Sequence, residues 1–215
     1  MSYEYTYELI RPLILKKGTP VLVTLHGIGA DYHDLREIIA PLGDRVLQFH
    51  IQGNIPIDHG YAYYLLDYTN QSEQEAIQDA RTSLHCFIQS ELRELDLLDH
   101  PVCLMGFSQG AILSSILLVD YPQAYRAGVI LNGRKVDSLK TNLSYEHRDV
   151  YVIQGKQDQR FPIPSGKELA NYLSSCGCSV TYDEFDVGHG INDAECRAVV
   201  KWLRQEFEWS EPNED

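Results

Sequence analysis

The sequence predicts an α/β protein in which a mostly parallel central sheet is covered by helices on both faces. Short, continuously apolar runs recur along the 215 residues, and segments with helical periodicity separate them. Strands that are buried on both faces read as continuous apolar runs, and consecutive parallel strands need a crossover helix. Because no linker, internal repeat or composition shift interrupts this alternation, we expect one domain over residues 1–215.

Each element follows from its own pattern, beginning with an N-terminal edge strand indicated by the period-two alternation of residues 3–10. The apolar runs predict buried strands over residues 21–27, 46–51, 101–107, 127–133 and 150–155, with a last strand over 178–185. Helical spacing predicts helices over residues 31–43, 72–95, 109–121, 162–177 and 192–209. Ser72 before two glutamates is typical of a helix N-cap, and Gly177 of a helix end.

Composition excludes several kinds of partner. With 31 acidic and 18 basic residues the net charge is −13, which argues against nucleic acid and against an anionic membrane surface. The longest apolar stretch, residues 111–119, is far shorter than a membrane span, so we expect no stable membrane insertion. The five cysteines have no disulfide or zinc spacing, and the N-terminus has no export signal, which together favour free thiols in the cytoplasm.

A Gly-x-Ser-x-Gly sequence, Gly106 to Gly110, lies where the apolar run 101–107 passes into the predicted helix 109–121. A strand-to-helix turn this sharp strains its central residue, and its neighbours must be almost free of side chain so that helix and strand can approach. We therefore expect Ser108 to stand exposed at a helix N-terminus as a nucleophile, the alternative being a glycine-rich turn with an incidental serine.

A serine nucleophile needs a base and an orienting acid, and in this arrangement they follow in the order Ser, Asp or Glu, His. His189, between two glycines after the last predicted strand, lies at the edge where α/β sites form, whereas the other seven histidines lie upstream of or between the motifs. Asp158 follows the strand 150–155 and is the favoured acid. Its rivals are Asp137, Asp149, Asp183 and Asp186.

The developing oxyanion needs backbone N–H donors, each worth about 3 kcal/mol. One donor is expected to be the amide of Gln109, directly after the nucleophile. The strand 21–27 ends in His26-Gly27, so the amide of Ile28 in the following loop is expected to be the second. Taken alone, His26-Gly27 is equally compatible with a simple strand-terminating turn.

The sequence resembles the phospholipase/carboxylesterase family of the α/β-hydrolase fold, which includes small esterases and acyl-protein thioesterases. The matching stretches are LHGIGADYHDL, GFSQGA, QGKQD followed by FP, and GHGI, which lie in the right order over residues 25–191. The resemblance implies Ser108 as nucleophile, Asp158 as acid, His189 as base, and oxyanion amides at Ile28 and Gln109. It also implies ester hydrolysis through an acyl-enzyme, with no metal or organic cofactor.

Two stretches depart from the family pattern. Gln154-Gly155 stands where members often have His-Gly, which we expect to leave the acid unaffected. The aromatic segment GYAYYLLDY, residues 60–68, replaces a segment that often carries a substrate-binding tryptophan. Its Tyr61, Tyr63 and Tyr64 are candidate substrate contacts, with packing against the sheet edge as an equally compatible interpretation.

Spacing also bears on the substrate. Only residues 133–148 separate the strand after the serine helix from the strand that carries Asp158, and segment 55–72 is short, so we expect no large cap domain. An open site favours small-molecule esters with short acyl chains; acyl-protein thioesterase or lysophospholipase activity is the alternative. Homodimers are common among small esterases of this type.

Two other classes of protein would predict different residues at the positions of the triad. A non-catalytic binding protein of the same fold predicts a broken triad, and a dienelactone-type hydrolase predicts cysteine at position 108; neither is found.

Overall fold

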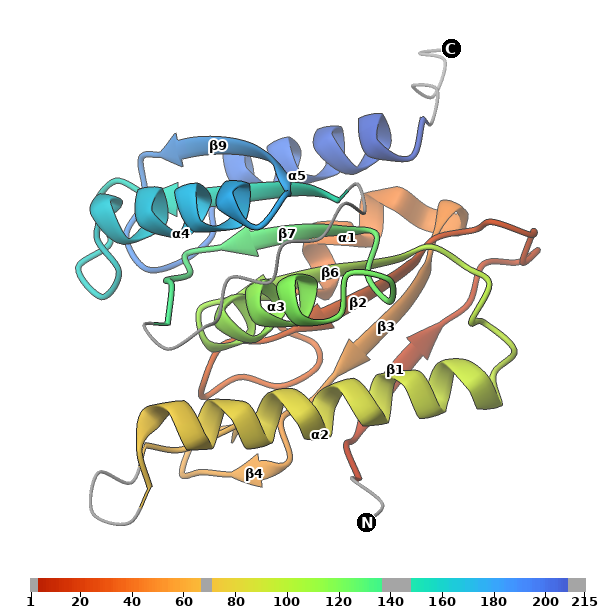
Figure 1. Cartoon of the computed structure of the whole chain (residues 1–215). Helices are drawn as coiled ribbons and strands as arrows, with labels where there is room; N and C mark the ends of the chain where they lie inside the picture. The colour runs from red at the N-terminus through yellow and green to blue at the C-terminus, as the bar shows by residue number, and fades with distance from the viewer. Residues whose placement is uncertain (1–3, 67–70, 137–147, 209–215) are drawn as a thin grey trace.

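The computed structural model describes residues 4–66, 71–136 and 148–208. One seven-stranded sheet organises them in the order β1-β3-β2-β6-β7-β8-β9, and only β1 at the edge runs antiparallel to its neighbour. The strands are β1 (Tyr7–Ile10), β2 (Val21–Leu25), β3 (Leu47–Ile51), β6 (Val102–Phe107), β7 (Ala127–Leu131), β8 (Asp149–Gly155) and β9 (Ser179–Phe185). The predicted mostly parallel α/β architecture is confirmed (Figure 1).

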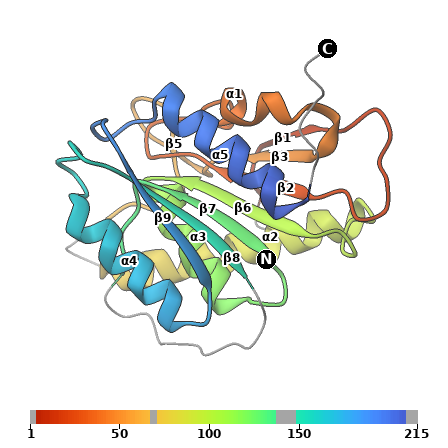
Figure 2. The same ribbon diagram turned by 90° about the horizontal axis from the view of Figure 1, so that it is seen from above.

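Helices cover both faces of this sheet (Figure 2). Helices α2 (Glu73–Glu94), α3 (Gln109–Asp120) and α4 (Ile163–Ser175) pack on one face, while α1 (Arg36–Ile39) and α5 (Asp193–Glu206) share the other. All five residues of β2 are buried, and its apolar side chains divide between the two cores: Val21, Val23 and Leu25 lie in the first and Leu22 in the second. Continuous apolar strands thus bury both of their faces, as the sequence pattern indicates.

Helix ends follow the local sequence. Ser72 caps α2 through a reciprocal pair of bonds: its hydroxyl accepts from the Glu75 amide and the Glu75 carboxylate accepts from the Ser72 amide. The chain turns at Gly177, where φ is +86°, after α4 has ended.

Two predicted elements differ from the structure. Instead of a helix over 31–43, the chain forms a turn, the single-turn helix α1 and a 3₁₀ segment over Ala40–Arg45, because Pro41 and Gly43, with φ at +52°, interrupt helical hydrogen bonding. The segment 55–72 contains an unpredicted hairpin of β4 (Ile55–Pro56) and β5 (Tyr61–Ala62). Most of the segment expected to lack a cap, 137–147, lies outside the described residues, and no large cap is evident in residues 4–66, 71–136 and 148–208.

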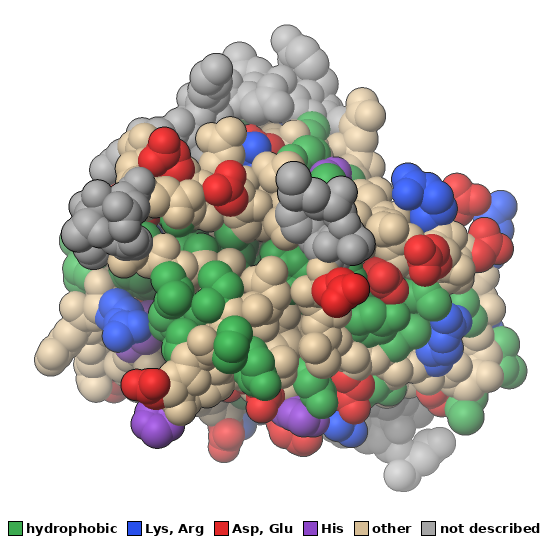
Figure 3. All heavy atoms as spheres, turned by 90° about the horizontal axis from the view of Figure 1, so that it is seen from below, with side chains coloured by type: hydrophobic (Ala, Val, Ile, Leu, Met, Phe, Trp, Pro, Cys, Tyr) green, Lys and Arg blue, Asp and Glu red, His purple; other side chains and the backbone are tan. Residues whose placement is uncertain are grey.

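The face that carries α2 mixes apolar patches with acidic side chains, and the described Lys and Arg side chains stand there singly or in small groups (Figure 3). Of the helices the structure describes, none combines the length and apolar character required to cross a bilayer.

Candidate active site

Ser108 occupies the turn between β6 and α3 in a strained backbone conformation. Its φ of 52° and ψ of −109° lie in a region that non-glycine residues rarely adopt, at a cost of about 1–3 kcal/mol. The Ser108 amide donates to the Leu131 carbonyl at 3.0 Å, which fixes the turn against β7. The side chain lies at the N-terminus of α3 but only 4% of the residue is exposed, so the expectation of a freely exposed serine is wrong: neighbouring loops enclose it.

The two flanking glycines are required for space, as expected from the sequence. A Cβ atom at Gly106 would lie 2.3 Å from the Gly110 carbonyl oxygen, and one at Gly110 would lie 2.0 Å from the Leu25 carbonyl oxygen. These contacts are with main chain, which cannot rotate away. The helix that follows Ser108 therefore packs directly on the ends of β2 and β6.

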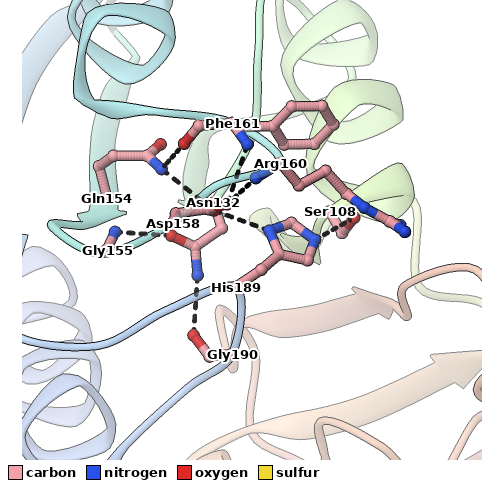
Figure 4. A network of polar contacts seen from close by, with 9 residues as sticks. All are labelled: Ser108, Asn132, Gln154, Gly155, Asp158, Arg160, Phe161, His189 and Gly190. Carbon is pink, nitrogen blue, oxygen red and sulfur yellow. Dashed lines mark hydrogen bonds and ion pairs between the residues drawn. The ribbon is translucent and has the colours of Figure 1, made fainter.

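His189 joins the serine to the acid, although the three residues follow three different strands (Figure 4). Its Nδ1 lies 2.7 Å from Asp158 Oδ2, and its Nε2 lies 2.8 Å from Ser108 Oγ. An ionised carboxylate only accepts hydrogen bonds, so Nδ1–H donates to Asp158 and the neutral ring leaves Nε2 to accept from the serine hydroxyl. The rings of Phe107 and Phe161 lie 5.2 and 5.4 Å from the imidazole and limit its rotation.

The Asp158 carboxylate is fully buried and is held by N–H donors on both oxygens. Oδ1 accepts from the amides of Arg160 and Phe161 at 2.8 and 2.9 Å, and Oδ2 accepts from Gln154 Nε2 at 3.3 Å in addition to His189. Gln154 thus contacts the acid directly, and Asp158 keeps its position on His189 with Gln154 beside it. Such donors stabilise the charged form of a buried acid.

Asn132, at the end of β7, links the loops that carry the acid and the base. Its Oδ1 accepts from the Gly155 amide at 2.7 Å, and its Nδ2 donates to the Gly190 carbonyl at 2.8 Å. Asn132 is fully buried and has a φ of +49°, which asparagine tolerates better than most residues. A Cβ at Gly155 would lie 2.5 Å from the Gly188 carbonyl oxygen, so the two loops also touch through their main chains.

The amides of Ile28 and Gln109 are positioned at the same edge of the sheet, after β2 and β6 respectively. Gln109 is the first residue of α3, and a first-turn amide has no acceptor within its helix. In the part of the chain that the structure describes, neither amide has a hydrogen-bond acceptor. Free N–H groups at a helix N-terminus favour negative charge.

His26 holds the loop that carries Ile28. The His26 ring is almost fully buried; its Nδ1 lies 2.6 Å from the Gly27 carbonyl oxygen, and its Nε2 lies 2.8 Å from the Gly53 amide. Since the Gly53 amide is a donor, Nε2 accepts and Nδ1–H donates, which defines a neutral ring. Burial lowers the pKa of His26, which keeps the ring in this neutral form.

The three tyrosines proposed from the sequence as substrate contacts differ in their surroundings. Tyr63 is 2% exposed, and its hydroxyl donates to the Ile51 carbonyl and accepts from the His26 amide, so the protein itself occupies that group. Tyr64 is also buried, and both residues line a cavity of about 490 Å³ between α2 and the β4–β5 hairpin. The partly exposed Tyr61 pairs with Ala30 through its main chain, and for Tyr61 and Tyr64 substrate contact stays a prediction.

The other predicted acids lie apart from this relay. Asp149 begins β8 at the opposite end of the sheet, Asp183 lies within β9 and accepts from the Tyr151 hydroxyl, and Asp186 accepts from the Gln157 side chain; Asp137 lies outside the described residues. Sequence reasoning did not single out Asn132, although a polar residue at the carboxyl end of a buried strand was a usable signal. Among the described residues, no group of three or more His, Cys, Asp or Glu side chains could hold a metal ion.

A mostly parallel sheet with a strained serine turn after β6, an acid after β8 and a histidine after β9 defines the α/β-hydrolase fold. The model of the phospholipase/carboxylesterase family matches residues 58–206, and the chain belongs to this family. It is a carboxylic ester hydrolase.

Individual relatives agree with this assignment. The chain is 25% identical over 196 residues to MhqD of Bacillus subtilis (strain 168), which is named as a hydrolase, and the match covers 89% of this chain and 97% of the relative. The Bacillus cereus carboxylesterase superposes with a TM-score of 0.84 at 19% identity over 94% of each chain. The carboxylesterase of Mesorhizobium loti superposes with a TM-score of 0.80 at 25% identity, over 93% of this chain and 94% of the other.

Proposed function

We propose that the protein hydrolyses small, short-chain carboxylic esters through a Ser108–His189–Asp158 triad and an acyl-enzyme intermediate. The continuous hydrogen-bond chain from Ser108 Oγ through the imidazole to Asp158, at 2.8 and 2.7 Å, is the observation that carries this proposal. A serine hydroxyl is a weak nucleophile until such a base accepts its proton.

In the first half of the reaction, His189 Nε2 takes the Ser108 proton as Oγ bonds to the acyl carbon. The carbonyl π electrons move to oxygen, and the amides of Ile28 and Gln109 donate to the resulting oxyanion. When the carbonyl re-forms, the bond to the alcohol oxygen breaks, and that oxygen takes the proton from His189. Asp158 stays ionised throughout; it orients the imidazole and stabilises its positive form.

In the second half, water attacks the acyl-serine. His189 takes a proton from the water as its oxygen bonds to the acyl carbon, and the oxyanion again lies between the two amides. Collapse breaks the bond to Ser108 Oγ, which recovers its proton from His189, and the carboxylic acid leaves. Each proton is returned, so the triad alone completes the cycle.

The proposed substrate class rests on two features: the connections around the site are short, and the described residues show no large cap over it. No large cap is evident in the part of the chain that the structure describes, which supports small esters in place of lipid aggregates. Hydrolysis of thioesters or lysophospholipids would use the same chemical steps, and it is the alternative to be tested beside the hydrolysis of small esters. The five thiols are all free, which supports a reducing compartment such as the cytoplasm.

The test combines labelling with a substrate series. A fluorophosphonate probe should label the wild type and should not label Ser108→Ala. Ser114→Ala is the matched control, because Ser114 lies in α3, the helix that follows Ser108, and its buried hydroxyl has no partner among the described residues. Wild-type turnover of 4-nitrophenyl acetate and butyrate, exceeding that of acyl-CoA thioesters and lysophospholipids, supports the proposal. Equal labelling of Ser108→Ala and wild type contradicts it.

A further inference from the structure

Arg160 belongs to the turn that holds the Asp158 carboxylate. Its amide donates to Asp158 Oδ1 at 2.8 Å, and the amide of the next residue, Phe161, donates to the same oxygen at 2.9 Å. The Phe161 ring packs edge-on against the His189 imidazole, with ring centres 5.4 Å apart. The backbone from which the arginine side chain begins is therefore fixed relative to the triad.

The Arg160 side chain is directed toward the reacting serine. In Figure 4 it extends from the Asp158 turn past the imidazole, to the side on which Ser108 lies. Arg160 is exposed, and in the described part of the chain its guanidinium has no carboxylate partner. Arg134, whose guanidinium lies 5.8 Å from the centre of the Phe161 ring, is instead paired with Glu73. Arg160 is thus a cation at this rim that has no carboxylate partner among the described residues, so its charge is left for another group.

The positive charge of Arg160 is opposite in sign to the net charge of the protein. A net charge of −13 disfavours the approach of any anion, so a substrate with a negative group needs a local cation to be held near Ser108. Guanidinium presents paired N–H donors whose spacing matches the two oxygens of a carboxylate or a phosphate. A neutral ester would leave these donors to water.

We propose that Arg160 is a specificity residue that binds an anionic group of the substrate, so that the preferred esters carry a carboxylate or phosphate close to the scissile bond. This inference rests on the proposed function of Ser108, His189 and Asp158. The two anionic groups share the recognition chemistry, and the negative group belongs either to the acyl part or to the alcohol part of the ester.

The test compares substrates that share the reacting ester and differ in whether they carry a negative group. The 4-nitrophenyl monoester of adipic acid is paired with 4-nitrophenyl hexanoate for the acyl side. For the alcohol side, 4-acetoxybenzoate and 4-acetoxyphenyl phosphate are each paired with 4-acetoxybenzamide. Arg160→Gln should lower kcat/KM about tenfold or more for the anionic member of at least one pair, mainly through KM, and less than twofold for the neutral member. Arg160→Lys should restore part of the preference, because it keeps the charge and loses the paired donors.

Lys156→Gln is the matched control. Lys156 is exposed two residues before Asp158 and lies close enough to Glu184 on β9 for their charges to interact. Lys156→Gln therefore changes the net charge of the protein by the same amount as Arg160→Gln, but the charge that it removes lies beside Glu184 and not on the serine side. The ratio of anionic to neutral turnover should be unchanged in this variant.

The possible outcomes separate the two proposals. If Arg160→Gln lowers both members of every pair by the same factor, or changes neither, the specificity role is refuted while the triad stands. Equal loss in Lys156→Gln refutes it as well, since the effect would then come from net charge. Absence of Ser108-dependent turnover for every substrate refutes the proposed function and, with it, this inference.

Discussion

Gly110→Ala tests whether close packing at the serine turn is what positions the site. The added Cβ would lie 2.0 Å from the Leu25 carbonyl oxygen, 2.5 Å from its carbonyl carbon and 2.8 Å from the His26 carbonyl oxygen. Carbon atoms in contact lie about 3.5–4.0 Å apart, so helix α3 must withdraw from the end of β2 by about 1 Å. All three obstructing atoms are main chain in the central part of the sheet, so a side-chain rearrangement cannot relieve the contact.

The magnitude follows from two opposing effects. Alanine in place of glycine favours a helix by up to about 1 kcal/mol. Over-packing costs about 1–3 kcal/mol and more where the backbone must shift, so the steric effect wins and the free energy of unfolding should fall by about 2 kcal/mol. The same withdrawal separates the Gln109 amide from that of Ile28, and a misplacement of about 1 Å lowers turnover by about 100-fold.

Gly190→Ala provides the matched control beside the histidine. A Cβ at Gly190 meets no atom within 4 Å, and its φ lies outside the left-handed region. Turnover of 4-nitrophenyl acetate and urea-induced unfolding should therefore stay near wild-type values in Gly190→Ala and fall in Gly110→Ala. If Gly110→Ala retains full activity and stability, or if both variants lose them equally, the steric argument for the serine turn is refuted.

Two further predictions concern Asn132, which links the loops of the acid and the base, and His50, a buried histidine of β3. Asn132→Gly keeps the positive φ accessible but removes both side-chain hydrogen bonds. It should lower kcat about tenfold with little change in KM, and the free energy of unfolding measured in urea should fall by about 1–3 kcal/mol. An unchanged kcat contradicts the role of Asn132 in holding the two loops. Burial lowers the pKa of His50 to about 4. Between pH 6.5 and 4 the unfolded chain therefore takes up a proton that the folded protein does not. The free energy of unfolding that is present above pH 6.5 should fall by about 3 kcal/mol over this range. Urea unfolding across this range measures the fall, and His50→Gln should reduce its slope; an equal slope in both proteins contradicts the assignment to His50.

The main parts of the candidate site could be predicted because each one has a recognisable local sequence pattern. The Ser108 turn needs small neighbours, and the structure supplies the steric reason in the carbonyl contacts of Gly106 and Gly110. Asp158 and His189 each follow the carboxyl end of a strand, and parallel strands bring these ends to one edge. Glycines beside a serine and polar residues after a buried strand can both be seen in short stretches of sequence, so they can be recognised without knowing the packing.

The supporting contacts could not be predicted, since they depend on which loops meet in space. Nothing near Asn132 in the sequence shows that its amide lies between Gly155 and Gly190. Gln154 is separated from Asp158 by a turn whose shape decides whether the side chains meet. For Tyr63, the aromatic character of its segment indicates burial or binding equally well, and the hydrogen bonds of its hydroxyl distinguish them.

The tyrosine segment also explains how two amides from separate loops keep a common position. The Gln109 side chain accepts from the Tyr63 amide and donates to the Tyr64 carbonyl, both at 2.8 Å. Two residues earlier, the Tyr61 carbonyl accepts from the Gly29 amide in the loop that carries Ile28, at 2.9 Å. Main chain between Tyr61 and Tyr64 thus connects the residues on both sides of the proposed oxyanion site. Because fixed donors need no reorganisation as charge develops, the proposed mechanism assigns this segment the role of holding the two amides in place.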